Sequence, residues 1–147
     1  MEIKEALKLA AVEAAKAKDQ VRLDTVRMVN SAIRYKEIEK RGPLGDAEVK
    51  GVLSTLVKQR RESIEQFKKG GRQDLVDKES REAEILLSFL PQQLGRDQIV
   101  MKAKEVIASV GAQSKQDMGK VMKLLVKDLA GQADGATVSQ VVSELLK

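Results

Sequence analysis

The sequence predicts an all-α protein, with an N-terminal bundle of about four helices followed by a small C-terminal three-helix domain. The 147 residues include only two prolines, one tyrosine and two phenylalanines. Alanine, leucine, glutamate and lysine are abundant, and all four are strong helix formers. Apolar side chains also recur at three- and four-residue steps, which is the spacing of one face of a helix. We expect the two domains at residues 1–92 and 93–147.

Four amphipathic patterns fill the first domain. Their expected ranges are, in order, 2–17, 20–40, 46–69 and 73–89. Asp19 and Asp46 precede apolar runs, so each is expected to cap the helix that follows it. Gly42 and Pro43 interrupt the pattern between the second and third helices. Pro91 closes the fourth helix, and residues 92–95 form the domain boundary.

The second domain shows three shorter patterns, the first two ending at Gly111 and Gly131. The last pattern, over 138–146, is rich in valine and could be a strand by propensity. Its apolar residues nevertheless recur at i, i+3, i+4 and i+7, which favours a helix. Helix boundaries in this domain are expected at Ser114, Asp117 and Asp134.

Composition excludes several kinds of chemistry. The chain has no cysteine and no histidine, so thiolate and imidazole chemistry are absent. Carboxylates remain as acid–base groups, and the candidates for paired hydrolytic work are Glu62, Asp74, Asp77, Glu82 and Glu84. Each lies among basic residues at helical spacing, which is typical of a solvated ion-pair face, with expected pairs Arg61–Glu65, Lys78–Glu82 and Arg81–Glu84. We therefore expect no catalytic residue, metal or cofactor.

Location and core packing can also be predicted. No basic-then-apolar leader and no long apolar run is present, so a cytoplasmic protein without a membrane segment is expected. Arg60 falls on the apolar stripe of the third helix. Its methylenes are expected to cover the core while its guanidinium reaches a carboxylate or water, although a ligand role is the alternative. Tyr35 and Phe67 are expected at the core or its edge.

The basic residues suggest a polyanion partner, because the net charge is +5. Met118, Gly119 and Lys120 are predicted to begin a short helix, where backbone N–H groups can approach a phosphate. The candidate contacts in this domain are Lys115, Gly119, Lys120, Lys123, Lys127 and Gly135. A second basic patch comprises Arg61, Lys68, Lys69 and Arg72. The alternative is a capped helix that merely carries solvated lysines.

Spaced motifs then indicate a family. They are KQRRESIEQF (58–67), GRQDLV (71–76), EAEI (82–85), FLPQQL (89–94), DMGKVM (117–122) and ADG (133–135). In this order and at this length, they resemble the GatB/YqeY family across the whole chain. The resemblance implies an all-helical protein in two parts, related to the tail of the B subunit of the tRNA-dependent amidotransferase.

The resemblance also implies a function. Family domains of this kind help to hold tRNA, so we expect a non-catalytic module linked to aminoacyl-tRNA synthesis or tRNA-dependent amidation. Its partners would be tRNA, through backbone contacts, and an aminoacyl-tRNA synthetase or amidotransferase subunit. By the same resemblance, Gly119, Lys120 and Gly135 match family positions in the small domain. The alternatives are an adaptor that docks a partner subunit and, less favoured, an amidotransferase-like carbon–nitrogen ligase.

Overall fold

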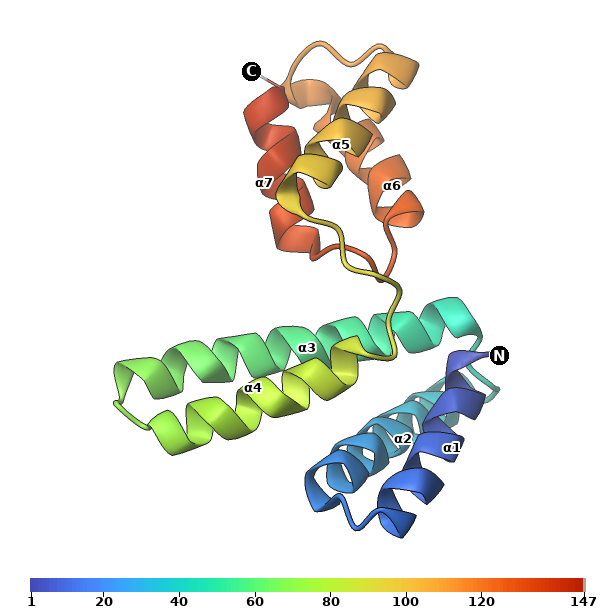
Figure 1. Ribbon diagram of the computed structural model, residues 1–147. Helices are drawn as coiled ribbons and strands as arrows, with labels where there is room; N and C mark the ends of the chain where they lie inside the picture. Colours follow the sequence, from blue (N-terminus) through green and yellow to red (C-terminus); the bar gives the residue numbers. More distant parts are fainter. Residues whose placement is uncertain (147) are drawn as a thin grey trace. The chain divides into compact units, whose positions relative to one another are not determined.

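The computed structural model describes residues 1–146, and throughout this range the regular secondary structure is helical, which confirms the all-α prediction. The chain divides into two compact units, Met1–Pro91 and Gln92–Lys147. The first unit contains four α-helices, and the second contains three α-helices and a short 3₁₀ helix. Their course can be followed in Figure 1. Each unit has its own apolar core.

The N-terminal unit consists of two helical hairpins. Its helices are α1 (Ile3–Lys16), α2 (Gln20–Lys40), α3 (Asp46–Lys69) and α4 (Gln73–Leu87). Helix α1 packs against α2, and α3 packs along the length of α4 (Figure 1). The turn between α3 and α4 uses Gly71 at φ 70°, a left-handed conformation that glycine adopts without a steric penalty. This turn allows α4 to return along α3.

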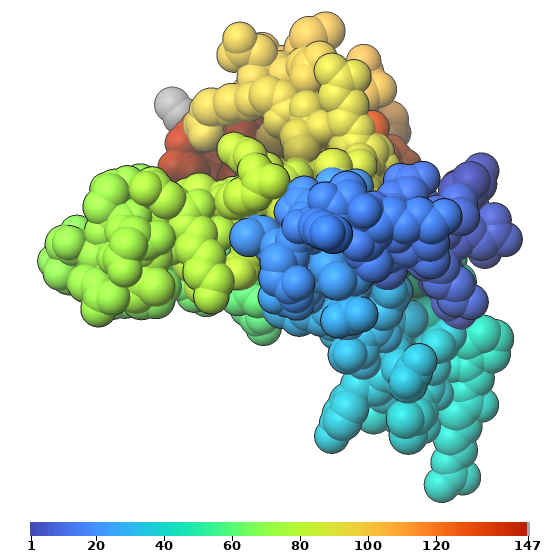
Figure 2. Space-filling view, turned by 60° about the horizontal axis from the view of Figure 1, so that its bottom comes forward, coloured from blue at the N-terminus to red at the C-terminus, as the bar shows by residue number. Residues whose placement is uncertain are grey.

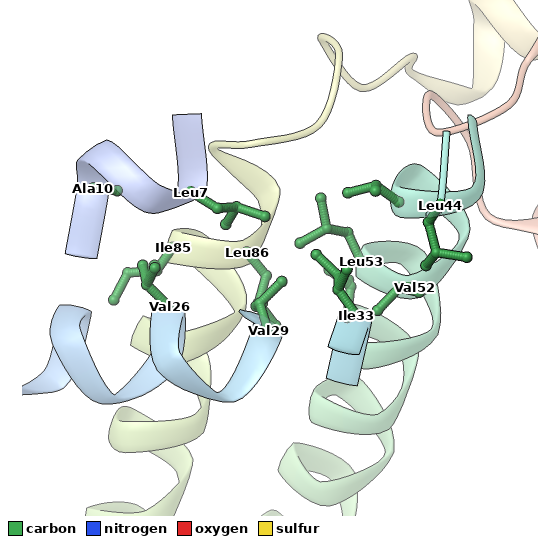
Figure 3. Packing of buried hydrophobic residues seen from close by; sticks show 12 residues of the cluster. Leu7, Ala10, Val26, Val29, Ile33, Leu44, Val52, Leu53, Ile85 and Leu86 are labelled. Atoms are coloured by element: carbon green, nitrogen blue, oxygen red, sulfur yellow. The ribbon is translucent and has the colours of Figure 1, made fainter. Parts of the chain in front are cut away.

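The core of this unit is aliphatic. Leu7, Val26, Leu53 and Leu86 are fully buried and come from four different helices (Figure 3). Val29, Ile33, Leu44, Val49, Val52, Val57 and Ile85 extend the same cluster. Burial of each leucine contributes about 1.5–3 kcal/mol. The stripes predicted from three- and four-residue spacing therefore meet in one core.

The two aspartates expected to cap helices behave differently. Asp19 accepts a hydrogen bond from the N–H of Arg22 at 3.2 Å, which confirms it as the cap of α2. Asp46 is instead the first residue of α3, and Gly45 holds the capping position. The Asp46 carboxylate accepts from the N–H of Ile3 at 2.9 Å. It therefore satisfies the first amide of α1 rather than an amide of its own helix.

Glu37 joins three segments of the N-terminal unit. Its Oε2 lies 2.6 Å from Nζ of Lys4 on α1 and accepts from the N–H of Leu44, in the α2–α3 loop, at 2.9 Å. The hydrogen bond from Lys4, followed by that from Leu44, lowers the pKa of the Glu37 carboxyl below its ordinary value. The ionised form of Glu37 is therefore the one that the fold selects.

The C-terminal half of α2 extends beyond the core. Tyr35 is 70% exposed, so its predicted position at the core or its edge is wrong, and Ile38 one turn later is equally exposed. Both residues lie on the side of α2 that faces solvent, away from buried Ile33, whereas Phe67 is half-buried as expected. Between this part of α2 and α3 lies an open groove, whose lining includes Ala32, Leu44, Val52 and Leu56.

The second unit is a three-helix domain. It contains α5 (Arg96–Val110), the short 3₁₀ helix η1 (Lys115–Asp117), α6 (Met118–Asp128) and α7 (Gly135–Leu145). The last segment is thus helical, as its spacing predicted. Buried side chains from all three α-helices form the core, namely Ile99, Ala103, Val121, Leu125, Leu129, Val138, Val141, Val142 and Leu146. The turn after α6 also pairs with the segment entering α5, because Leu94 donates to the carbonyl of Gln132 at 2.9 Å.

Candidate nucleic-acid interface

Helix α6 is positioned by a capped 3₁₀ turn at its start. Ser114 caps η1, with its Oγ accepting from the N–H of Gln116 at 3.3 Å. The Asp117 carboxylate accepts from the N–H of Gln113 at 3.0 Å, and this bond is the main reason that the pKa of Asp117 is lowered. Helix α6 follows without a break and buries Val121 and Leu125. These two residues determine which face of α6 points outward.

Three lysines share that outward face, which we call the lysine face. Lys120, Lys123 and Lys127 are spaced at i, i+3 and i+7, which places them together and opposite Val121 and Leu125. All three are exposed, and none forms an ion pair within 4.0 Å among the described residues. Within residues 1–146, no salt bridge therefore neutralises their positive charge, although the charge of Lys120 contributes to lowering the pKa of Asp117 one turn earlier.

Gly119 lies beside Lys123, one turn earlier on α6. A Cβ added at Gly119 would meet no heavy atom within 4 Å. Gly119 is the second residue of α6, and neither packing nor a positive φ requires a glycine at this position. The backbone is consequently open to close approach from outside at this point.

The structure divides the predicted contacts between the two ends of α6. Lys115 and Gly119 lie at its beginning, whereas Gly135 starts α7, after the turn that follows the end of α6 (Figure 1). An eleven-residue helix spans about 16 Å, so Gly135 belongs to the far end. Lys127 is near that end, and Lys123 lies between. The six residues therefore do not surround one pocket.

Backbone amides contribute less than the sequence predicted. The N–H of Gln116 donates to the Ser114 side chain, the N–H of Asp117 to the Ser114 carbonyl, and the N–H of Met118 to the Lys115 carbonyl. These three amides are used within η1 and are therefore not available to a phosphate. At the start of α7, the Asp134 carboxylate likewise accepts from the N–H of Ala136. The lysine side chains are thus the most accessible positive groups at this surface.

The second basic patch is partly neutralised. Arg61, Lys68, Lys69 and Arg72 are all exposed along the end of α3 and its turn into α4. Lys68 lies 3.9 Å from Glu65, and Arg72 makes two hydrogen bonds of 3.2 and 3.1 Å to Asp74. The Arg72 guanidinium lowers the pKa of the Asp74 carboxyl. Within this patch, only Arg61 and Lys69 form no ion pair with another described residue. The patch therefore offers less unpaired positive charge than the lysine face.

Arg60 has the structural role expected of it. Its Nε lies 3.0 Å from Oε2 of Glu82 and 3.4 Å from Oε2 of Glu79, both on α4. The arginine side chain is 18% exposed and both glutamates are 16% exposed. Burial, and then the charge of Glu79, raise the pKa of the Glu82 carboxyl. One guanidinium thus faces two carboxylates in a mostly dry contact between α3 and α4.

The carboxylates considered for catalysis do not converge. Glu62, Asp74, Asp77 and Glu84 are exposed, and Glu82 is occupied by Arg60. The ion pairs expected within single helices are wrong, because Glu65 pairs with Lys68 and Glu82 with Arg60, while Arg81 lies 3.6 Å from Asp19. Within residues 1–146, no group of three acidic side chains is arranged to hold a metal ion.

Taken together, the fold and these surfaces define a small all-helical protein in two units, with an unpaired basic face on the second unit. The family model described as Yqey-like protein matches residues 4–146. The chain therefore belongs to the Yqey-like protein family, which agrees with the resemblance seen in its motifs.

Relatives with a similar sequence occur in yeasts. Each is named "Altered inheritance of mitochondria protein 41, mitochondrial". The relative in Lachancea thermotolerans is 42% identical over 77 residues, which cover 52% of this chain and 41% of the relative. The relative in Kluyveromyces lactis is 34% identical over 125 residues, covering 79% and 67% respectively. The match thus spans less than half the length of the first of these relatives.

These names bear on location. The expectation of a cytoplasmic protein is contradicted, because the relatives are named as mitochondrial proteins. Among the residues that the structure describes, no helix combines the length and the apolar character needed to cross a membrane. Neither the family description nor the relatives' names mention RNA or amidation.

Proposed function

We propose that this protein is a non-catalytic module that binds the phosphate backbone of RNA, and of tRNA in particular, through the lysine face of α6. The observation that carries this proposal is the position of Lys120, Lys123 and Lys127 on one outward face without ion-pair partners. Lysine attracts phosphate as a point charge and needs no contact with a base. The choice of tRNA follows from the motif resemblance, which links the family to aminoacyl-tRNA synthesis and amidation.

Binding of this kind depends on salt. Each phosphate contact releases about 0.7–0.9 counterions, so affinity falls with increasing salt concentration. The chain offers one tyrosine and two phenylalanines for base stacking, and the two phenylalanines are half-buried. Recognition would therefore depend on the shape and backbone of the RNA rather than on its sequence.

Titration of labelled tRNA at two salt concentrations tests the proposal. The double variant Lys120→Glu/Lys123→Glu should weaken binding at least about tenfold and reduce the salt slope by about two. The matched control is Lys102→Glu/Lys104→Glu, which changes the net charge equally on exposed positions of α5. Equal losses for the two variants would show that only net charge matters. Absence of binding at low salt would refute the proposal.

Gly119 provides a second test, independent of charge. Gly51 in α3 is its control, because both glycines lie within helices and an added Cβ meets nothing at either position. Both Gly→Ala changes should stabilise the protein. If RNA approaches the backbone at the start of α6, only Gly119→Ala should also weaken RNA binding.

One observation favours the alternative of a protein-docking adaptor. Leu124 and Val126 flank the lysine face, and both are exposed apolar residues. A protein partner with an acidic, partly apolar surface would suit them. Recovery of one defined partner after nuclease treatment, with loss of that partner in Leu124→Lys, would favour this function over RNA binding.

A further inference from the structure

Helix α1 carries an apolar pair on the face that points away from its core. Leu7, Ala10 and Ala14 are buried against the rest of the unit, whereas Leu9 and Val12 are 50% and 52% exposed. Figure 2 shows α1, in the darker blues, at the surface of the N-terminal unit. Aliphatic side chains this exposed and adjacent have no role in the core described above.

Charged residues continue this outward row at both ends. Glu5 lies one turn before Leu9, and Lys16 lies one turn after Val12, so the row reads Glu5, Leu9, Val12, Lys16 at steps of four, three and four. Glu5 and Lys16 are exposed, and neither forms an ion pair among the described residues. They lie eleven positions apart, about 16 Å along the helix, so they cannot neutralise each other within one chain.

The row is self-complementary in the antiparallel direction. A two-fold axis passing between Ala10 and Ala11 places Leu9 opposite Val12 of a second copy, and Glu5 opposite Lys16 of that copy. The flanking residues Lys8 and Glu13, which are also exposed, are related by the same axis. A two-fold interface requires one patch to match itself in this way. A parallel arrangement would instead place like charges together.

We propose that the outward face of α1 is a contact surface for a second copy of this chain, with the two α1 helices antiparallel. In this contact, Leu9 and Val12 of each copy bury their exposed surface against each other, and two Glu5–Lys16 pairs close its ends. Helices of fourteen residues give a small interface, below the roughly 1,200 Å² of stable complexes. The dimer is therefore weak and forms in a concentration-dependent manner.

Charge exchange tests the arrangement directly. The single variants Glu5→Lys and Lys16→Glu each create two like-charged contacts in a homodimer, which should weaken self-association at least about tenfold. A mixture of these two variants can form a heterodimer with both pairs restored. Sedimentation equilibrium of the full chain over micromolar to millimolar concentrations should show association of the mixture but not of either variant alone. The double variant in one chain should also associate.

The apolar pair supplies a second measurement. Leu9→Lys should abolish the dimer, whereas Ile38→Lys, at an even more exposed position on α2, should leave it intact. Both changes are at the surface, and circular dichroism would verify that each variant is folded. A monomer at every concentration, or a dimer unaffected by Leu9→Lys, overturns the proposal. Nuclease-treated protein is used, so the result does not depend on RNA binding by α6.

Discussion

Replacement of Arg60 by methionine would test the charge cluster between α3 and α4. The guanidinium is the cation in contact with Glu79 and Glu82, at 3.4 and 3.0 Å. Methionine keeps an unbranched apolar stem beside Met28 but removes the charge. Two glutamates that are 16% exposed would then face each other without this cation.

The magnitude follows from burial. Removal of one partner of a fully buried ion pair costs about 3–5 kcal/mol. The cluster keeps some contact with water, and one glutamate can take up a proton, so we expect Arg60→Met to lower the free energy of unfolding by about 2–3 kcal/mol at neutral pH. The corresponding change at exposed Arg61, which has no ion pair, should cost less than about 0.5 kcal/mol.

The direction of the pH dependence can also be derived. The pKa of Glu82 is raised, so the folded state holds this proton more tightly than the unfolded state does. The resulting stabilisation is complete below the unfolded pKa and is lost as pH rises through the folded pKa. Arg60 lowers this pKa, so its removal raises the pKa further. The cost of Arg60→Met should therefore decrease under mildly acidic conditions.

Urea unfolding, measured by hydrogen exchange in α3 and α4, reports on the N-terminal unit alone. Arg60→Met and Arg61→Met would be compared at neutral and mildly acidic pH. Equal costs for the two variants at neutral pH would refute the reasoning. So would a cost of Arg60→Met that grows on acidification.

Three further predictions concern stability. Leu53→Ala, at a fully buried position, should lower the free energy of unfolding by about 3 kcal/mol, against less than about 1 kcal/mol for exposed Leu124→Ala, in thermal denaturation. Gly51→Ala, inside α3, should raise stability by about 0.5–1 kcal/mol in the same assay, and Gly119→Ala, in the first turn of α6, should raise it by less. A loss of stability would show that the space around the glycine is filled. Glu37 should titrate below the ordinary pKa of a glutamate in NMR, and its stabilising contribution is lost as pH falls through that lowered pKa. A normal midpoint would contradict its hydrogen bonds to α1 and to the α2–α3 loop.

Much of the fold could be predicted because helix periodicity is a local property. The apolar stripes gave all the main helices, and Asp19 was identified as a cap from its position before an apolar run. Partners across helices could not be predicted in this way. Asp46 precedes an apolar run just as Asp19 does. Its carboxylate nevertheless accepts from the N–H of Ile3, which is distant in sequence but close in space.

The candidate site shows the same division. The i, i+3, i+7 spacing of Lys120, Lys123 and Lys127 predicted a shared face, since it depends on one helix only. Whether the backbone amides before α6 are free or hydrogen-bonded depended instead on η1, whose hydrogen bonds begin at Ser114. The α1 row was missed because its apolar part is only Leu9 and Val12. Its symmetry becomes apparent only once the buried side of α1 is known.

The hydrogen bonds at the entrance to the second unit have an evolutionary consequence. Leu94 donates to Gln132, and the Gln93 side chain donates to the carbonyl of Gly131 at 2.7 Å. The segment that enters this unit is thus hydrogen-bonded to the turn between α6 and α7 of the same unit. The segment from Gln92 onward has its own apolar core and its own closing hydrogen bonds, which are properties of a domain that can be joined to another polypeptide by gene fusion. A break after Gly95 would instead leave the Gln132 carbonyl without that donor.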